Sequence, residues 1–325
     1  MKKFCLLLAM LLAFPLAWAD GEFTPVSTCG TVIDQPGHYR LVNDLSTTTI
    51  PDPGDFVACV IIASDEVTLD LNGYTISCDL DAPYFSFGVF SDYLNDGVNI
   101  MGGTVTDCVI GIEMSGNHSG TVKGMTMTEN VLGMEIIAGS EVEIIKNKFL
   151  GNFETGIYAT SFFSGDYVGP GLGHKFHKNL FVDQGFAGIE TDGIEESVIS
   201  CNRMEGNLVG LEMESPGFGN TIRKNVANSN GYGIFAVGLI LGPDFVLPIA
   251  AGNTFMRNTA LDNSEVDLAE AFLDFTNQMA YELPDSCQNM WKHNNYGYSI
   301  AVADCIPPSK AFNEENCAPT HDDFD

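Results

Sequence analysis

The chain has 325 residues, of which 14 are Lys or Arg and 43 are Asp or Glu, so its formal net charge is −29 at pH 7. A surface of this kind repels nucleic acid and anionic lipid at long range, so neither is expected as a partner. It favours Ca²⁺, neutral ligands or basic ligands instead.

Residues 1–19 have the pattern of an export signal. Met1-Lys2-Lys3 is a charged start, an apolar run follows it, and Ala17-Trp18-Ala19 is a cleavage sequence of the A-x-A type. The apolar run is too short to span a bilayer, and no later run is long enough for a membrane helix. We therefore expect a secreted or periplasmic protein that has no transmembrane segment and is a monomer.

Residues 20–85 are expected to form an N-terminal cap and the first coils of a repeat. Gly37–Leu41 and Ala58–Ile62 have the composition of short strands, and Glu66–Ile76 alternates on both sides of an Asn72-Gly73 turn. A stacked repeat needs an atypical end to cover its first exposed layer, and this segment is the natural candidate.

Residues 86–263 contain one short phrase that returns at a nearly fixed step. Each copy opens with Gly and an apolar residue, and the steps are 22 or 23 residues except for one of 32. The copies begin at Gly88, Gly111, Gly133, Gly156, Gly188, Gly210 and Gly233. Two Asn landmarks keep the same period: Asn147, Asn179, Asn202, Asn225 and Asn258, then Asn130, Asn152, Asn207, Asn230 and Asn263. We interpret the Asn residues as internal amide ladders that fill tight turns.

Each copy contains about three short strands and three turns. Met134 and Ile136 point to one side of the first strand and Glu135 points to the other, while Val142–Ile145 and Lys148–Leu150 provide the second and third strands. Such a copy is typical of one coil of a parallel β-helix, which buries its apolar side by stacking on its neighbours. The predicted fold class is therefore all-β, a single-stranded parallel β-helix with a cap at each end.

Two coils are longer than the others by about ten residues. The insertions include Ser161–Gly173, after Tyr158, and Leu239–Pro248, after Phe235. Both leave the same strand at corresponding points. In repeat proteins, insertions on one face usually mark the working face.

Residues 264–325 are expected to form a C-terminal cap and an acidic tail. Ser264–Leu273 is compatible with one last strand or with a short helix, and His321–Asp325 is predicted to be disordered.

The cysteines predict disulfides. Cys5 lies in the signal, which leaves an even number of cysteines, and no C-x-x-C pair is present. The spacing leaves the connectivity open. We expect Cys59–Cys78 and Cys287–Cys305, because each pair would staple a terminal cap.

The motifs resemble those of a known family. Asp65–Ile76, the Gly-Ile…Asn…Asn copies and Cys287–Asn295 with Cys305 are similar to the exported right-handed parallel β-helix repeat proteins, which include the NosD-type periplasmic domain and pectate-lyase-like enzymes. The resemblance implies a right-handed helix over nearly the whole chain. It implies no single activity, because the family contains lyases, hydrolases, epimerases and proteins with no known chemistry. The chain lacks the Asp-Pro-His-Asp epimerase motif, the Asn-x-Asp, Asp-Asp, Gly-His-Gly series of the pectin hydrolases, and a dense His/Met cluster for copper.

Stacking turns equal positions of successive copies into columns. The outward position after each Gly-apolar pair reads Phe90, Glu113, Glu135, Tyr158, Glu190, Glu212 and Phe235. Asp192 and Glu214 lie two residues further along the same face. Glu190, Asp192, Glu212 and Glu214 are therefore predicted to form a square of carboxylates, with Glu135, Tyr158 and Phe235 as substrate-binding neighbours.

The carboxylate square has several interpretations. A hydrolase needs one protonated and one ionised carboxyl, with Glu190 and Glu212 in an order that the sequence leaves open. A Ca²⁺ site at Asp192 and Glu214 would use the same oxygens, and a lyase would add Lys175 or a histidine as base. The alternatives without chemistry are a solvated acidic stripe and a structural or adhesive solenoid. The favoured partner is a glycan.

Two further groups stand out. The position before the first Asn landmark reads Lys123, Lys146, Lys178, Cys201, Lys224 and Arg257. We interpret these cations as side chains that reduce the repulsion between carboxylates of neighbouring turns. The alternative is that they bind an acidic glycan. His174 is predicted to be a loop residue and a general acid or base.

Overall fold

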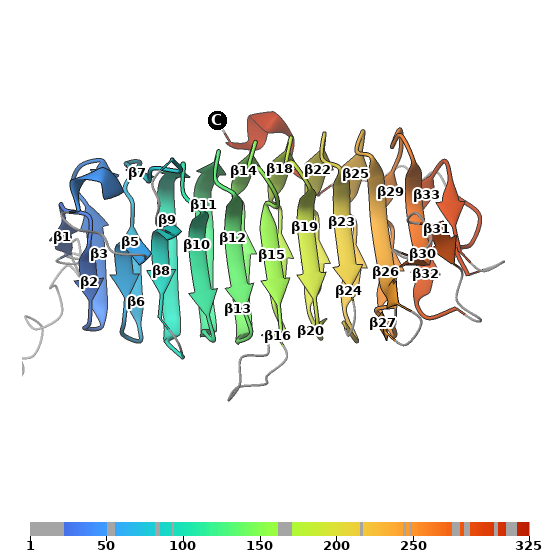
Figure 1. The fold of residues 1–325 in the computed structure, drawn as a ribbon, viewed down its shortest axis with the longest axis horizontal. Coiled ribbons are helices and arrows are strands. Elements are labelled where there is room, and N and C mark those ends of the chain that lie inside the picture. Colours follow the sequence, from blue (N-terminus) through green and yellow to red (C-terminus); the bar gives the residue numbers. More distant parts are fainter. Residues whose placement is uncertain are drawn as a thin grey trace, which may run out of the picture.

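The chain forms one long parallel β-helix in which each coil lies on the preceding one (Figure 1). The computed structural model describes residues 23–50, 56–81, 85–92, 94–161, 171–214, 217–242, 245–247, 249–274, 280–282, 287–301, 305–309 and 317–324. The predicted all-β fold class is confirmed. In this part of the chain, no helix has the length and the apolar composition needed to cross a membrane.

One wall of the coils is a 13-stranded sheet that carries the predicted site. Its strands pair in parallel from coil to coil, apart from the antiparallel pairs β26–β27 and β30–β31. The strands are β2 (Thr31–Ile33), β5 (Phe56–Ile62), β8 (Phe85–Ser91), β10 (Ile110–Ser115), β12 (Leu132–Ile137), β15 (Ile157–Thr160), β19 (Ala187–Asp192), β23 (Val209–Glu214), β26 (Tyr232–Gly242), β27 (Phe245–Leu247), β30 (Val266–Asp274), β31 (Ala280–Glu282) and β34 (Ser299–Ile300).

The remaining strands form a 21-stranded sheet that bends around the other side of each coil. They are β1 (Thr24–Val26), β3 (Gly37–Leu41), β4 (Leu45–Ser46), β6 (Val67–Asp70), β7 (Thr75–Ser77), β9 (Asp96–Thr106), β11 (His118–Thr128), β13 (Ser140–Ile145), β14 (Lys148–Leu150), β16 (Gly171–Leu172), β17 (Lys175–His177), β18 (Leu180–Val182), β20 (Ile194–Glu195), β21 (Val198–Ser200), β22 (Arg203–Glu205), β24 (Thr221–Arg223), β25 (Val226–Asn228), β28 (Thr254–Met256), β29 (Thr259–Ala260), β32 (Met290–Lys292) and β33 (Asn295–Tyr296). Two short 3-10 helices, η1 (Thr47–Thr49) and η2 (His321–Phe324), complete the described elements.

The apolar residue after each repeated Gly lies inside the coil. Pairing aligns these residues in one fully buried column, Val89, Ile112, Met134, Ile157, Ile189, Leu211 and Ile234, and Leu268 of the next coil extends it. The Gly itself is required by close packing between coils. A Cβ on Gly111 would lie 2.4 Å from the carbonyl oxygen of Gly133, so a larger residue would push two coils apart.

The expected amide ladders are present inside the turns. The backbone N–H of Asn202 and its Nδ2 both donate to Oδ1 of Asn225, each at 3.0 Å, and Nδ2 also donates to the carbonyl of Phe176. The same pattern joins the buried residues Asn147, Asn179, Asn202, Asn225, Asn258 and Asn294. A second ladder joins Asn130, Asn152, Gln184, Asn207, Asn230 and Asn263. Each ladder satisfies buried backbone donors that no sheet strand can reach.

Two ladders end on buried carboxylates at the C-terminal end of the helix. Every step donates toward the next coil, so the last amide needs an acceptor. Asn263 Nδ2 donates to Asp267 at 2.7 Å. A third ladder ends at Asn289, which donates to the fully buried Glu270, and the indole N–H of Trp291 donates to the same carboxylate at 2.9 Å. Asp267 and Glu270 lie on β30, so Ser264–Leu273 contributes a strand and not a helix.

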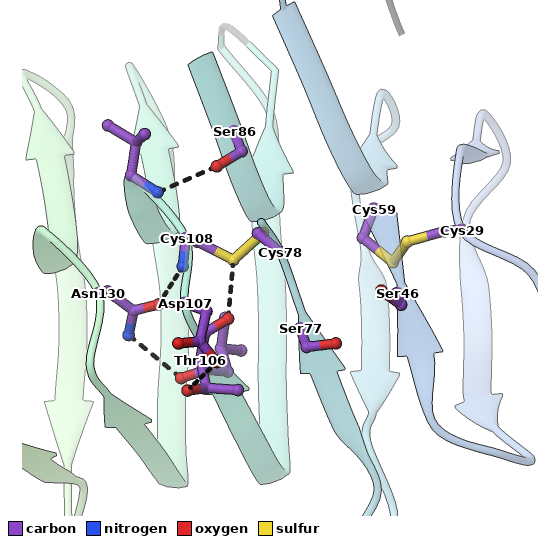
Figure 2. The surroundings of a disulfide bond; sticks show 12 residues. Cys29, Ser46, Cys59, Ser77, Cys78, Ser86, Thr106, Asp107, Cys108 and Asn130 are labelled. Atoms are coloured by element: carbon purple, nitrogen blue, oxygen red, sulfur yellow. Dashed lines mark hydrogen bonds between the residues drawn. A yellow bond between two sulfur atoms is a disulfide. The ribbon is translucent and has the colours of Figure 1, made fainter. Parts of the chain in front are cut away.

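Four disulfides join the eight cysteines that follow the predicted signal. Cys287–Cys305 is confirmed. The predicted Cys59–Cys78 pair is wrong, because Cys59 bonds to Cys29 and Cys78 bonds to Cys108 (Figure 2). Both bonds have Cα–Cα distances below 5 Å and link positions that stack in neighbouring coils. The fourth bond, Cys201–Cys317, returns the C-terminal tail to the middle of the helix.

Three other segments refine the prediction. The acidic tail that was expected to be disordered contains η2. Leu239 is not in a loop, because β26 extends to Gly242 and pairs with β30 along this stretch. The predicted signal at 1–19 and most of the first insertion, 162–170, lie outside the described residues.

We predict that Asn225→Leu lowers the free energy of unfolding by roughly 3 kcal/mol or more. The backbone N–H of Asn202 and the carbonyl of Ile199 would lose their partners inside the coil, and each unpaired buried group costs about 1–3 kcal/mol. Denaturant unfolding measures the difference. The exposed Arg223→Leu change in the same coil is the control and should stay within about 0.5 kcal/mol of wild type. Equal effects of the two substitutions would contradict the structural role of the ladder.

Candidate functional site

The predicted outward column exists as one row on the 13-stranded sheet. Parallel pairing aligns Phe90, Glu113, Glu135, Tyr158, Glu190, Glu212 and Phe235. We call this row the acidic row. Since Ile189 and Thr191 on either side of Glu190 are fully buried in the coil, alternation places Glu190 on the outer surface.

A second outward column completes the predicted square. Asp192 pairs with Glu214 in the register that pairs Glu190 with Glu212. Strands β19 and β23 are neighbours in a sheet, so these pairs are separated by about 4.7–4.9 Å along the helix axis. The predicted clustering of the four carboxylates is confirmed, and their catalytic role stays a prediction.

Glu212 is the most enclosed member of the square. Its side chain is 7% exposed, and its Oε2 is buried without a hydrogen-bond partner. Burial, followed by the charges of Glu214 and Glu190, raises its pKa to about 8. Glu212 is therefore largely protonated at neutral pH.

Glu190 has a different environment in the neighbouring coil. Burial raises its pKa, but Thr155 Oγ1 donates a hydrogen bond to Glu190 Oε2 at 2.9 Å and lowers it. That bond stabilises the ionised form, which accepts hydrogen bonds. The two adjacent carboxyls thus differ in their surroundings: Glu212 Oε2 is buried without a hydrogen-bond partner, whereas Glu190 Oε2 accepts a hydrogen bond from Thr155.

Other acidic residues of the row and the square also have raised pKa values. Burial raises the pKa of Glu113, Glu135 and Glu214 to about 7, with neighbouring carboxylates adding to the effect at Glu113 and Glu214. Burial also raises the pKa of Asp192, and it raises that of Tyr158 to about 12. Strands β10, β12, β15, β19 and β23 contain no Lys, Arg or His, so no cation on these strands relieves the repulsion. Glu113 belongs to the site, although the sequence prediction did not single it out.

Aromatic groups stand at both ends of the acidic row. At the N-terminal end, Phe56 and Phe85 are about half exposed, and both pack on Phe87, which also contacts Phe90. At the other end, Phe235 packs against Tyr232 with ring centroids 5.0 Å apart. Phe235 is only 5% exposed, so it offers little surface to a substrate. Tyr158 and Phe90 are partly accessible, and Tyr158 lies between the acids of the row.

His174 lies in the turn between β16 and β17, as predicted, but its side chain is buried and not accessible from solvent. The side chain is 1% exposed and lies inside the coil, where Nδ1 accepts a hydrogen bond from the backbone N–H of Val142. It begins the third ladder, whose later members are Ser197, Asn220, Asn253 and Asn289. Burial lowers the His174 pKa to about 4, so the ring is neutral. The environment of His174 is determined by its place in this ladder, where the side chain points into the coil.

The Ca²⁺ interpretation gains no support from the arrangement of the acids. Among the described residues, no three His, Cys, Asp or Glu side chains are grouped as metal ligands. A hollow of about 460 Å³ lies on the other sheet, where Glu143, Lys175 and Glu141 contribute to its lining. Lys175 forms an ion pair with Glu143 there, away from the acidic row.

Comparisons with solved structures define the class of protein. The Dettilon tailspike protein gives a TM-score of 0.56 at 13% identity, and the match covers 87% of this chain and 61% of the tailspike. The A-modules of two Azotobacter vinelandii mannuronan C-5 epimerases, AlgE4 and AlgE6, give TM-scores of 0.53 and 0.51 at 13% and 10% identity. These matches cover 90% of this chain, and 86% and 92% of the respective modules. The chain is a right-handed parallel β-helix, as predicted.

Sequence comparison adds no closer relationship. No protein-family model matches the chain, and no curated protein matches its sequence. The likeness to the solved structures therefore concerns the fold, and the site must be interpreted from its own residues.

We predict that the protein becomes less stable as pH rises from about 4.5 to 8. The folded state holds a proton on Glu212 that the unfolded chain has lost above its pKa of 4.5, so folding binds protons in this range and the free energy of unfolding falls with pH. The side chain that Glu212→Gln introduces cannot ionise. This substitution should therefore remove the part of the fall in the free energy of unfolding that Glu212 causes, on the order of a few kcal/mol. Denaturant unfolding at several pH values measures the slope, with Glu265→Gln as the exposed control. Parallel slopes for wild type and Glu212→Gln would contradict the prediction.

Proposed function

We propose that the acidic row binds a polysaccharide and that Glu190 and Glu212 hydrolyse a glycosidic bond in it. The observation that carries the proposal is the contrast between the two adjacent carboxyls. Glu212 is enclosed, unpartnered at Oε2 and protonated, whereas Glu190 accepts a hydrogen bond from Thr155. Glycoside hydrolysis requires one protonated carboxyl and one ionised carboxyl.

The sequence left open which of the two residues is the acid and which is the nucleophile, and this contrast assigns the two roles. Glu212 acts as the general acid and donates its proton to the oxygen of the leaving sugar. Glu190 acts as the nucleophile at the anomeric carbon, after which Glu212 takes a proton from the attacking water. Neighbouring strands separate the pair by about 5 Å, which is the spacing of retaining enzymes, so we expect retention of configuration.

The charge of the face restricts the substrate. The acidic row carries four carboxyl groups, with Asp192 and Glu214 beside it, and its five central strands contain no cation. A polymer of uronic acids would be repelled from this surface. The substrate we infer is neutral or bears amino groups, and it packs on Tyr158 between the paired acids.

Two further observations support a role outside the cytoplasm on a glycan. Four disulfides are typical of a protein that folds in an oxidising compartment, so we infer export to the periplasm or the medium. The names of the mannuronan epimerases state that proteins with this fold act on a polysaccharide.

The second candidate is a scaffold with no chemistry. It is favoured by the outward apolar clusters at the two ends of the row, which pack as structural surfaces do. Under this alternative, the acidic row is a solvated stripe on an acidic solenoid.

We predict that Glu190→Gln and Glu212→Gln each reduce cleavage of the accepted glycan by about 100-fold or more, the usual contribution of a positioned acid or base. Reducing-end release from a panel of neutral, amino-bearing and uronic acid polysaccharides provides the assay. Glu265→Gln is the control for loss of one exposed carboxylate. Full activity of both site variants, or a wild-type protein that neither cleaves nor binds any glycan, would support the scaffold.

A further inference from the structure

The cations of this acidic protein are concentrated at one bend of the 21-stranded sheet. Nine of its 14 Lys and Arg residues lie there, which separates them from the acidic row. We call them the basic corner: Lys123, Lys146, Lys148, Lys178, Arg203, Arg223, Lys224, Arg257 and Lys292. Successive coils therefore present positive charge along one straight edge of the helix, at a rise of about 4.8 Å per coil.

Backbone geometry explains why one row is so regular. Lys146, Lys178, Lys224 and Arg257 all have φ between 54° and 57° and directly precede a ladder Asn. This left-handed turn residue points away from the coil, so its side chain extends outward. Lys123 lies one residue earlier in its own coil, because it pairs with Ile145 and not with Lys146.

The chain's own acidic tail crosses the basic corner. Cys201 occupies the turn position between Lys178 and Lys224, and it bonds to Cys317, 116 residues later. Arg203 Nε donates to the carbonyl oxygen of Pro319 at 2.6 Å. Figure 1 shows the C-terminal segment lying over the edge of the coils that contain β14 and β18.

Carboxylates of the tail lie near the lysines beneath them. Hydrogen bonds from Thr320 lower the pKa of Asp323, and the charges of Lys178 and Lys146 lower it further. Asp322 and Asp323 are both exposed, so the tail presents these two side chains to solvent. The carboxylate of Asp323 thus lies close enough to Lys178 and Lys146 to feel their charges.

The row continues on the C-terminal side of Cys201 with Lys224 and Arg257. Arg257 is exposed and Lys224 is half-buried, and within the described residues neither forms an ion pair. Both lie on the C-terminal side of Cys201 in the row, whereas Lys146 and Lys178 lie on the side that Asp323 approaches. Asp323 of the tail therefore lies on the side of Lys146 and Lys178, and Lys224 and Arg257 continue the row beyond Cys201.

We propose that the basic corner binds a linear acidic polysaccharide through its carboxylates and that the C-terminal tail is an intramolecular competitor for part of this surface. A row with Lys or Arg at this turn in four of five successive coils, Lys146, Lys178, Lys224 and Arg257, fits a linear polymer with spaced single charges. Nucleic acid carries one charge per 1.7 Å of duplex, which is much denser than the row. The surface is separate from the acidic row, so the proposal is independent of the hydrolase.

We expect the Asp322→Asn/Asp323→Asn variant to bind polygalacturonate roughly threefold to tenfold more tightly than wild type, because two competing charges are removed. The Cys201–Cys317 bond stays intact in this variant. Titration calorimetry at low ionic strength is the measurement. Glu196→Gln/Glu265→Gln removes two exposed carboxylates elsewhere and controls for net charge. Equal affinity of the two double variants would overturn the role of the tail.

The surface itself is tested by neutralising the two cations of the row on the C-terminal side of Cys201. Lys224→Gln/Arg257→Gln should weaken polygalacturonate binding at least tenfold, whereas Lys175→Gln/Arg40→Gln makes the same change in net charge outside the corner and should have a small effect. Equal losses in the two variants would overturn the site. A single-stranded oligonucleotide that binds more tightly than polygalacturonate would overturn the assignment to an acidic polysaccharide.

Discussion

Register between coils is the constraint on which the rest of the structure depends. Each turn leaves backbone N–H groups inside the helix, where water cannot reach them, and an Asn amide from the next coil accepts their hydrogen bonds. A coil that slipped by one residue would break all ladders at once and turn its apolar side chains outward. Asp267 and Glu270 end this one-directional chain of donors, so the last strands are part of the same system.

The register that satisfies the ladders also produces the acidic row. Equal positions become neighbours about 4.8 Å apart, and therefore a Glu that recurs once per coil becomes a line of carboxylates. Such a line is unfavourable when ionised, and burial followed by the charges of Glu214 and Glu190 raises the pKa of Glu212. A surface that opposes stability at neutral pH is easier to explain by function than by folding.

Charge segregation follows from the same repetition. The turn position before the Asn of the first ladder carries Lys or Arg in four coils, at Lys146, Lys178, Lys224 and Arg257. Acids gather on one wall and cations at one bend, so the two surfaces attract different ligands although the net charge is strongly negative. The tail that crosses the bend shows that the chain itself uses this difference.

The sequence by itself determined the β-helix, the amide ladders and the clustering of Glu190 with Glu212, because all three follow from a period that can be counted along the chain. Only the tertiary structure decided the partner of Cys59, the burial of His174 and the position of the tail. Disulfide pairing and burial depend on which atoms surround a residue, and the first insertion, which ends at Gly173, interrupts the period just before His174. The contrast between Glu212 and Glu190 also required coordinates, since a buried oxygen and one hydroxyl group from Thr155 separate two residues that look equivalent in the sequence.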